Sequence, residues 1–323
     1  MSRLLVDDRY TGQHGIGRYA REVLSRLSIR WEPLGLGGHP ASPLDALRSL
    51  KSLEQDQVIY SPGYAAFASR RHQILTLHDL IHLETSWPGR AKYNAYYNLV
   101  IRPRAKQAGL VFTVSSTSEE AIRRWIGDDS VHIVNTGNAC SDAFSPGAPR
   151  EEPAVPYILF VGNLRAHKNF PIVLKILAAL ERLEARVLVP LGERASGEAL
   201  ASAAGVSTRI RWLSSPSDEQ LAEEYRGATA TLVPSSTEGF GLPALESVSC
   251  GTPVVHWRGC PALSEASLGC SVTVSELDDI EAWVEAVTEL LEHPTRVTPP
   301  SRPTWDEVAG RVDVGLQRAL ERR

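Results

Sequence analysis

The sequence lacks several features that define whole classes of protein. No apolar run approaches the ~20 residues needed to span a bilayer. The opening stretch MSRLLVDDRYTG lacks the apolar core of a signal peptide, because acids follow Val6. The cysteines form no C-x-x-C pair, and no histidine stands at metal-ligand spacing from Cys140, Cys250, Cys260 or Cys270. We therefore expect a cytoplasmic protein with reduced cysteines and no metal site.

Strong charge of one sign is also absent. The 323 residues are 43% hydrophobic and 22% charged, with a net charge of −4, as in ordinary globular proteins. Residues 1–150 carry 18 basic and 14 acidic side chains, whereas residues 151–323 carry 16 and 24. The mildly basic first half would favour an anionic partner or an anionic membrane surface. No nucleic-acid-binding motif is present, so we expect no nucleic-acid partner.

Short apolar runs alternate with helical patterns along the whole chain, which predicts parallel sheets covered by helices. A proline-rich segment, SPGAPREEPAVP, interrupts the pattern at residues 145–156. We therefore expect an α/β protein with two domains, residues 1–150 and 151–303, and a last helix at about 304–323 that packs back on the first domain. The expected strands are 3–8, 57–62, 73–79, 109–116, 157–163, 186–192, 209–214, 230–236 and 252–257, and the first half has expected helices at 17–27 and 43–53.

The segment EGFGLPALE places carboxylates at both ends of a glycine-containing turn, Glu238 and Glu246. Pro243 suits the start of a helix and Gly251 its end, so we expect a short helix at about 243–250. Backbone N–H groups at a helix start bind anions, and carboxylates accept hydrogen bonds from sugar hydroxyls. The pattern fits a nucleotide sugar. In the alternative interpretation, Glu246 interacts with the helix dipole and Glu238 is solvated.

Longer motifs around these residues resemble the retaining family 4 glycosyltransferases. PSSTEGFGLPALESVSCGTPVV, residues 234–255, is similar to the family's E-x7-E signature. Further similarities, in the family's order, are found at residues 7–22, 75–80, 160–170 and 304–312. The resemblance implies a metal-independent enzyme of the GT-B fold, with two Rossmann-like domains whose parallel sheets face a central cleft. The second domain would bind the donor and the first the acceptor.

The same resemblance implies roles for individual residues. Glu246 would bind the ribose, Glu238 would contact the donor sugar, and Lys168 would pair with the diphosphate. Asn163 occupies a position where many relatives have an arginine, so Arg165 or His167 would supply the second positive charge. The other residues assigned to the donor site are Gly162, Ser214, Gly239, Phe240, Gly241 and Leu242.

Lys168 stands before an expected helix, where a cation is unfavourable unless an anion compensates it. A departing nucleoside diphosphate would provide that anion; the alternative is a solvated loop lysine. His78 and Asp79 follow a strand, at the sheet edge where ligands bind; the alternative is a hydrogen-bonded core pair. The resemblance places His78 against the donor sugar. We assign catalytic roles to His78, Lys168 and Glu238, and no nucleophile.

The segment GIGRYA also matches the dinucleotide fingerprint G-x-G-x-x-A through Gly15, Gly17 and Ala20, followed by Glu32. That match would indicate an NAD-dependent oxidoreductase, but several residues separate it from the preceding strand. We interpret Gly15, Gly17 and Arg18 as a loop that, together with Asp79, contacts phosphate or acceptor.

Residues 90–107 combine basic and aromatic side chains, as at a membrane interface. Pro103 should kink or break a helix there. The alternatives are packing on the same domain and docking to a lipid-linked acceptor at the inner membrane surface. The basic residues are Arg90, Lys92, Arg102, Arg104 and Lys106.

The sequence thus predicts a hexosyltransferase that uses a nucleotide sugar as substrate and needs no cofactor. GDP-mannose is the expected donor, because the motifs at His78 and Lys168 look most like those of mannosyltransferases. The acceptor would be a glycan, a lipid-linked glycan or a small molecule. The alternative is a non-catalytic nucleotide-sugar-binding protein or partner subunit.

Overall fold

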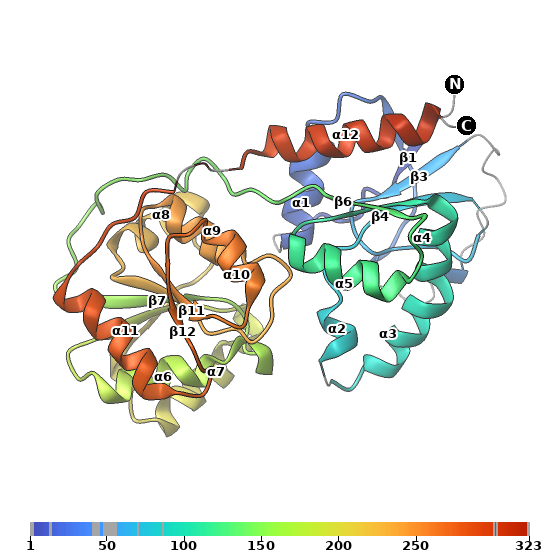
Figure 1. The fold of residues 1–323 in the computed structure, drawn as a ribbon. Helices are drawn as coiled ribbons and strands as arrows, with labels where there is room; N and C mark the ends of the chain where they lie inside the picture. Colours follow the sequence, from blue (N-terminus) through green and yellow to red (C-terminus); the bar gives the residue numbers. More distant parts are fainter. Residues whose placement is uncertain are drawn as a thin grey trace. The chain divides into compact units, whose positions relative to one another are not determined.

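The computed structural model describes residues 3–12, 15–40, 46–47, 57–69, 71–85, 87–299, 301 and 303–321. The chain forms two compact units: residues 1–139 with 303–323, and residues 140–302. We call them the N-terminal unit and the C-terminal unit (Figure 1). Each contains one six-stranded sheet in which all paired strands are parallel. This confirms the predicted α/β fold with two parallel sheets.

The sheet of the N-terminal unit has the strand order β2-β1-β3-β4-β5-β6. Strands β1, β3, β4 and β5 are almost entirely buried, as expected for a parallel sheet covered on both faces. The strands are β1 Leu4–Val6, β2 Trp31–Pro33, β3 Val58–Ser61, β4 His72–Thr76, β5 Leu110–Thr113 and β6 His132–Asn135. The helices are α1 Gly15–Leu24, α2 Ile81–Glu84, α3 Arg90–Tyr96, α4 Arg102–Ala108, α5 Ser116–Ile126 and α12 Trp305–Glu321.

The last helix, α12, belongs to the N-terminal unit and lies beside α1 (Figure 1). Val308, Val312 and Leu316 are fully buried on one side of it. The carboxylate of Asp313 accepts a 2.7 Å hydrogen bond from the backbone N–H of Ser28. The apolar stripe and this hydrogen bond hold the end of the chain against the first sheet's helices.

We expected Pro103 to kink or break the helix, and the structure shows that no break occurs. Helix α3 continues through a π-helical turn, Tyr97–Ile101, directly into α4, with Pro103 in the first turn of α4. The wider turn lets the Arg102 N–H bond the Tyr97 carbonyl, so the helix accommodates a residue that has no N–H. Tyr97, Ile101 and Ala105 are buried, so this face of the segment packs on its own unit.

The C-terminal unit has the strand order β12-β11-β10-β7-β8-β9. Its core includes a fully buried Trp283, whose ring N–H donates to the Leu277 carbonyl. The strands are β7 Tyr157–Val161, β8 Glu184–Leu188, β9 Ile210–Trp212, β10 Ala230–Val233, β11 Val254–Trp257 and β12 Ser271–Val274. The helices are α6 Phe170–Ala179, α7 Arg194–Ala203, α8 Asp218–Gly227, α9 Leu242–Ser249, α10 Pro261–Ala266 and α11 Ile280–Glu292, with 3-10 turns at Ala166–Lys168, Leu191–Glu193 and Ser207–Arg209.

The units divide between residues 139 and 140, not at residue 150 as we expected from the prolines. The physical reason is that the segment before the prolines packs on α8. Phe144 is fully buried and meets the Tyr225 ring edge to face at 5.8 Å. Arg226 donates to the carbonyls of Ala143 and Ser145, each at 2.9 Å. These contacts assign the segment to the C-terminal unit.

Strands β2, β6 and β12 were not predicted. They lie at sheet edges and are only partly buried, so their sequences lack the continuous apolar runs of the inner strands. Most of the expected helix at 43–53 lies outside the described residues. In the part of the chain that the structure describes, no helix is both long and apolar enough to span a membrane.

Candidate active site

The strand order of the C-terminal unit creates a topological switch point between β7 and β10. The chain runs from β7 outward through β8 and β9, and then from β10 outward in the other direction through β11 and β12. In open α/β sheets, ligands bind beyond the carboxyl ends of the strands at such a point. The loops that follow β7 and β10 carry Lys168 and Glu238, so both residues lie at the switch point.

Two hydrogen bonds tie these loops together. The Ser236 N–H donates to the His167 carbonyl at 2.8 Å, and the Asn169 side-chain amide donates to the Pro234 carbonyl at 2.9 Å. Asn169 is left-handed, with φ 49°, a conformation that Asn tolerates better than most residues. The backbone on both sides of Lys168 is therefore fixed before α6 begins.

Lys168 and Glu238 form an ion pair, with Nζ 2.5 Å from Oε1. Their side chains are 15% and 9% exposed. The Ser235 hydroxyl donates to the same oxygen at 2.7 Å. Cys260 lies beside this pair: burial raises the pKa of its thiol to about 12, and the Glu238 carboxylate contributes to the rise. The compensating anion that we expected for Lys168 is thus a carboxylate of the same chain.

The turn after Glu238 leads into α9 through Gly241, which has φ +98°. A Cβ at Gly241 would lie 2.6 Å from Leu263 Cδ2, so no other residue fits without a shift. Helix α9 starts at Leu242, with Pro243 in its first turn, and Gly251 follows its C-cap with φ +83°. The N–H groups of the first turn lie next to the switch point, as an anion site requires.

Glu246 lies one turn into α9 and is 5% exposed. Its Oε2 accepts a 2.9 Å hydrogen bond from the Tyr225 hydroxyl on α8. The next residue, Ser247, donates to the Thr252 carbonyl at 2.9 Å, which fixes the helix against the loop that follows it. Sequence reasoning missed Tyr225, because its spacing from Leu221 is that of an ordinary core position.

The remaining donor-site candidates lie at the edge of this arrangement. Gly162 is close to Lys168: a Cβ atom added to Gly162 would lie 3.9 Å from Lys168 Cδ. Asn163 turns back to accept the Arg165 N–H at 3.1 Å, and the Arg165 side chain is exposed. Exposed Ser214, beyond β9, accepts a 3.0 Å hydrogen bond from Arg194. Arg194 therefore contacts one predicted donor-site residue, Ser214, which follows the edge strand of the sheet.

In the N-terminal unit, His78 follows β4 and is half-buried. Its Nε2 lies 3.0 Å from the Pro62 carbonyl, which can only accept, so Nε2 carries the proton. The Tyr19 ring meets the imidazole edge to face at 4.8 Å. Burial lowers the pKa of His78, and the Pro62 carbonyl and Asp79 only partly oppose this effect. The imidazole is thus neutral near pH 7, with Nδ1 as its basic atom.

Asp79 is positioned by α2. It accepts the Ile81 N–H at 3.0 Å and lies 3.8 Å from His82 Nδ1. Burial alone would raise the pKa of Asp79, but His82 and the Ile81 N–H outweigh burial and lower it. Asp79 is therefore ionised, with its carboxylate oriented by local backbone.

Gly15, Gly17 and Arg18 do not form the predicted loop; they are the first residues of α1. A Cβ on Gly17 would lie 2.0 Å from the Gly12 carbonyl oxygen, so the glycine lets the preceding chain cross the start of the helix. Since β1 ends at Val6, the glycines are not the tight strand-to-helix turn of a dinucleotide fingerprint.

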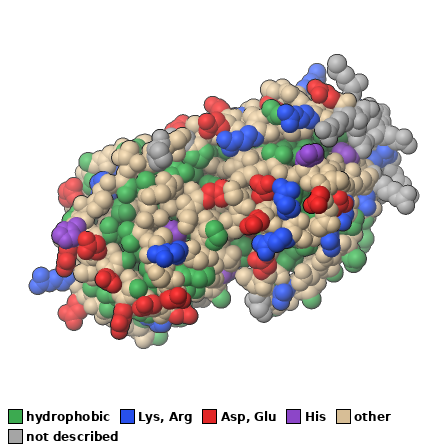
Figure 2. All heavy atoms as spheres, in the orientation of Figure 1, with side chains coloured by type: hydrophobic (Ala, Val, Ile, Leu, Met, Phe, Trp, Pro, Cys, Tyr) green, Lys and Arg blue, Asp and Glu red, His purple; other side chains and the backbone are tan. Residues whose placement is uncertain are grey.

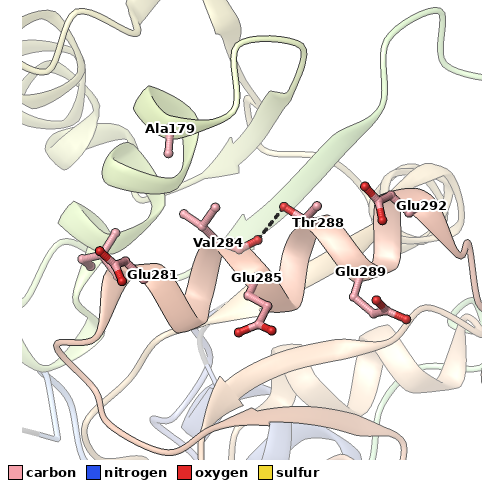
Figure 3. A pocket seen from close by; sticks show the side chains of 8 residues that line it. Ala179, Glu281, Val284, Glu285, Thr288, Glu289 and Glu292 are labelled. Atoms are coloured by element: carbon pink, nitrogen blue, oxygen red, sulfur yellow. Dashed lines mark hydrogen bonds between the residues drawn. The ribbon is translucent and has the colours of Figure 1, made fainter.

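A surface groove lies elsewhere on the C-terminal unit, between the end of α6 and α11 (Figure 3). Ala179, Val284 and Thr288 line it, flanked by the glutamates of α11. Figure 2 shows acidic side chains gathered at the lower left of the surface, in the region of α11. Helix α6 is about 15 Å long, and the groove lies at the end of α6 that is distant from Lys168. The glutamates of α11 would also repel a diphosphate. We therefore do not assign the donor to this groove. Among the described residues, no three His, Cys, Asp or Glu side chains are grouped to hold a metal.

A comparison with protein families identifies the class. Residues 144–307 match the family described as Glycosyl transferases group 1, and this range contains Lys168, Glu238 and Glu246. The match covers about half of the chain, and the chain belongs to this family.

Curated relatives are consistent with this assignment. The chain is 29% identical over 287 residues to O-antigen chain mannosyltransferase B of Escherichia coli, an alignment that covers 84% of this chain and 71% of that protein. It is 35% identical over 167 residues to D-inositol 3-phosphate glycosyltransferase of Mycolicibacterium smegmatis, covering 47% of this chain and 38% of the relative. The chain thus spans half or less of the inositol-phosphate enzymes that it matches.

Solved structures share the fold at low sequence identity. Sucrose-phosphate synthase of Thermosynechococcus elongatus aligns over 100% of this chain and 97% of its own, with a TM-score of 0.69 and 17% identity. WaaG, a glycosyltransferase involved in lipopolysaccharide biosynthesis, aligns over 98% of each chain, with a TM-score of 0.66 and 14% identity. The two sheets therefore have the GT-B glycosyltransferase architecture.

Proposed function

We propose that this protein transfers a hexose from a nucleotide diphosphate sugar to a glycan or lipid-linked acceptor, with retention of anomeric configuration. The observation that carries the proposal is the Lys168–Glu238 pair at the switch point of the second sheet. It supports the proposal because it combines a fixed cation with a carboxylate that can accept sugar hydroxyls, in loops next to the start of α9, where backbone N–H groups can bind an anion. Family membership supports a nucleotide sugar as the substrate.

Each residue of the proposed site has a separate chemical role. The Lys168 ammonium and the first N–H groups of α9 stabilise the charge that develops on the departing diphosphate. Glu246 binds ribose hydroxyls and Glu238 binds hydroxyls of the hexose. His78, neutral with its proton on Nε2, accepts a hydrogen bond from the sugar through Nδ1. We assign no protein nucleophile, and we propose that Lys168 takes the place of a metal ion.

The expected donor is GDP-mannose. Its support is the similarity over most of the chain to a protein named as an O-antigen chain mannosyltransferase. That relative also supports a surface-polysaccharide or lipid-linked acceptor. Segment 87–107 would bring a cytoplasmic enzyme to such an acceptor at the membrane, since it exposes Leu99 (75%) and Trp87 (38%) among basic residues.

Nucleotide binding and turnover test the proposal. Thermal unfolding is measured with GDP, UDP, dTDP and ADP; at 100 times its dissociation constant, the bound nucleotide should stabilise the fold by ~2.7 kcal/mol. GDP-mannose is then supplied with lipid-linked acceptors, and NMR follows the anomeric proton of the product. The proposal would be overturned if none of the four nucleotides raised the unfolding temperature. Binding without transfer to any acceptor would favour a non-catalytic sugar-nucleotide protein.

Replacing Glu246 by Ala should weaken nucleotide affinity about 10-fold or more, because two ribose hydroxyls lose a charged acceptor. Isothermal calorimetry measures the dissociation constant. Glu285→Ala is the matched control, since Glu285 is exposed on α11, and its affinity should equal that of the unmodified protein. Unchanged affinity in Glu246→Ala would remove the ribose role.

A further inference from the structure

The Glu246 carboxylate is the end of a flexible side chain, and its terminal torsion is broad and roughly two-fold. Its position on α9 alone does not fix the rotation of the carboxylate. The 2.9 Å hydrogen bond from the Tyr225 hydroxyl to Oε2 restrains this rotation. A carboxylate can only accept in this bond, so the tyrosine is the donor.

Tyr225 is itself rigidly held. Its ring is fully buried and packs edge to face on Phe144. Its backbone carbonyl accepts a 2.6 Å hydrogen bond from the Thr252 hydroxyl. Burial raises the pKa of Tyr225 well above the usual value, and the neighbouring Glu246 adds to the effect, so the phenol remains a protonated donor at physiological pH.

We propose that Tyr225 is a positioning residue for ribose recognition: it orients the Glu246 carboxylate and thereby sets the enzyme's preference for ribonucleotides. This inference rests on the proposed function, because it requires Glu246 to bind the ribose. Tyr225 itself touches Glu246, not the nucleotide. Its effect should therefore depend on the presence of both the ribose hydroxyls and the Glu246 carboxylate.

The readout is a ratio of affinities. Dissociation constants are measured by calorimetry for GDP and UDP, each against its 2′,3′-dideoxy analogue. Tyr225→Phe removes only the hydroxyl and keeps the ring against Phe144. We expect it to weaken ribonucleotide binding about 10-fold, the scale of one hydrogen bond to a charged group, and dideoxynucleotide binding less than about 2-fold.

The chain offers a matched control, a tyrosine of β7 that contacts the same helix. The Tyr157 hydroxyl is also buried and donates to a carbonyl of α8, that of Glu224, at 2.8 Å. Tyr157→Phe therefore removes an equivalent buried hydrogen bond without touching a site carboxylate. Its preference for ribonucleotides should match that of the unmodified protein; an equal loss in both variants would contradict a positioning role.

Glu246→Gln separates the two possible failures. If Glu246→Gln loses the ribose preference and Tyr225→Phe keeps it, this inference is wrong and the proposed function stands. If Glu246→Gln also keeps the preference, the ribose role of Glu246 itself is wrong. In the Glu246→Gln background, Tyr225→Phe should cause no further loss, because coupled residues are not additive.

A second variant keeps the test decisive if Tyr225→Phe does not fold. Replacement of Tyr225 by 4-aminophenylalanine keeps a neutral donor at the end of the ring. We expect the ribonucleotide preference to stay within about 2-fold of the original value. A 10-fold loss in spite of the retained donor would overturn the inference.

Discussion

Lys168 and Glu238 show what motif comparison can and cannot predict at the scale of single residues. Their types and loop positions were predicted, because each belongs to a motif whose residues are contiguous in sequence: Glu238 to the E-x7-E motif and Lys168 to the loop after β7. Their mutual ion pair and the adjacent Cys260 were not predicted. Residues brought together by strand order, as β7 and β10 are, leave no signal in a single sequence.

Replacing Lys168 by Ala should lower kcat more than donor affinity, because charge grows on the diphosphate as the glycosidic bond breaks. A loss of about 10²–10³-fold is the scale for one electrostatic stabiliser. Steady-state kinetics and calorimetry measure the two quantities separately. Lys175→Ala is the control, since Lys175 is exposed on α6. A loss of affinity with kcat unchanged would mean that Lys168 contributes only to ground-state binding.

Replacing Gly241 by Ala should destabilise the C-terminal unit by more than the ~1–2 kcal/mol that a left-handed alanine costs, since its Cβ also meets Leu263 at 2.6 Å. Gly205→Ala is the control for the backbone cost alone, because Gly205 has φ +71° and a Cβ added there would have no atom within 4 Å. Urea unfolding of both variants measures the difference. Equal destabilisation would mean that the turn adjusts to remove the steric contact.

At the scale of elements, burial decides what the sequence reveals. Most of the inner strands were predicted because both of their faces are buried, so they read as continuous apolar runs; β8, which is buried on one face only, is the exception to this burial. The edge strands β2, β6 and β12 mix exposed and buried positions, and they were missed. The boundary was displaced for a related reason: the contacts of Phe144 and Arg226 join segments about 80 residues apart, and prolines mark only local breaks.

Replacing Arg226 by Ala should destabilise the C-terminal unit by roughly 2–3 kcal/mol, because its guanidinium satisfies the carbonyls of Ala143 and Ser145. Chemical denaturation measures the free energy of unfolding. Arg211→Ala is the control, as the Arg211 side chain is 64% exposed. If the two variants had similar denaturant midpoints of unfolding, the hydrogen bonds from Arg226 to residues 143–145 would not contribute to stability.

At the scale of the whole molecule, each unit contains a histidine whose pKa is lowered by burial: His78 in the first and His256 in the second. His256 contacts the Trp257 carbonyl at 2.8 Å and the Ser271 hydroxyl at 3.1 Å. Below the unfolded pKa of ~6.5, the unfolded chain binds more protons than the folded one. Both histidines therefore make acid destabilising.

Unfolding by urea should thus require less denaturant at pH 5.5 than at pH 7.5. His256→Gln should reduce the difference between the two pH values, because its amide does not titrate in this range. Replacement of His293, an exposed histidine at the end of α11, should leave the difference unchanged. An identical pH dependence in His256→Gln would rule out this residue as a source of acid sensitivity.

Under the proposed function, the ion pair at the switch point would also make Lys168 discriminate among anions. Orthophosphate or free pyrophosphate has to compete for Lys168 with a carboxylate tethered 2.5 Å away, at a very high effective concentration. Such an ion offers the displaced Glu238 few hydrogen-bond donors. A sugar attached to the diphosphate offers more, since its hydroxyls give that carboxylate new donors. Discrimination against common phosphates would then result from an exchange of partners, without any steric gate.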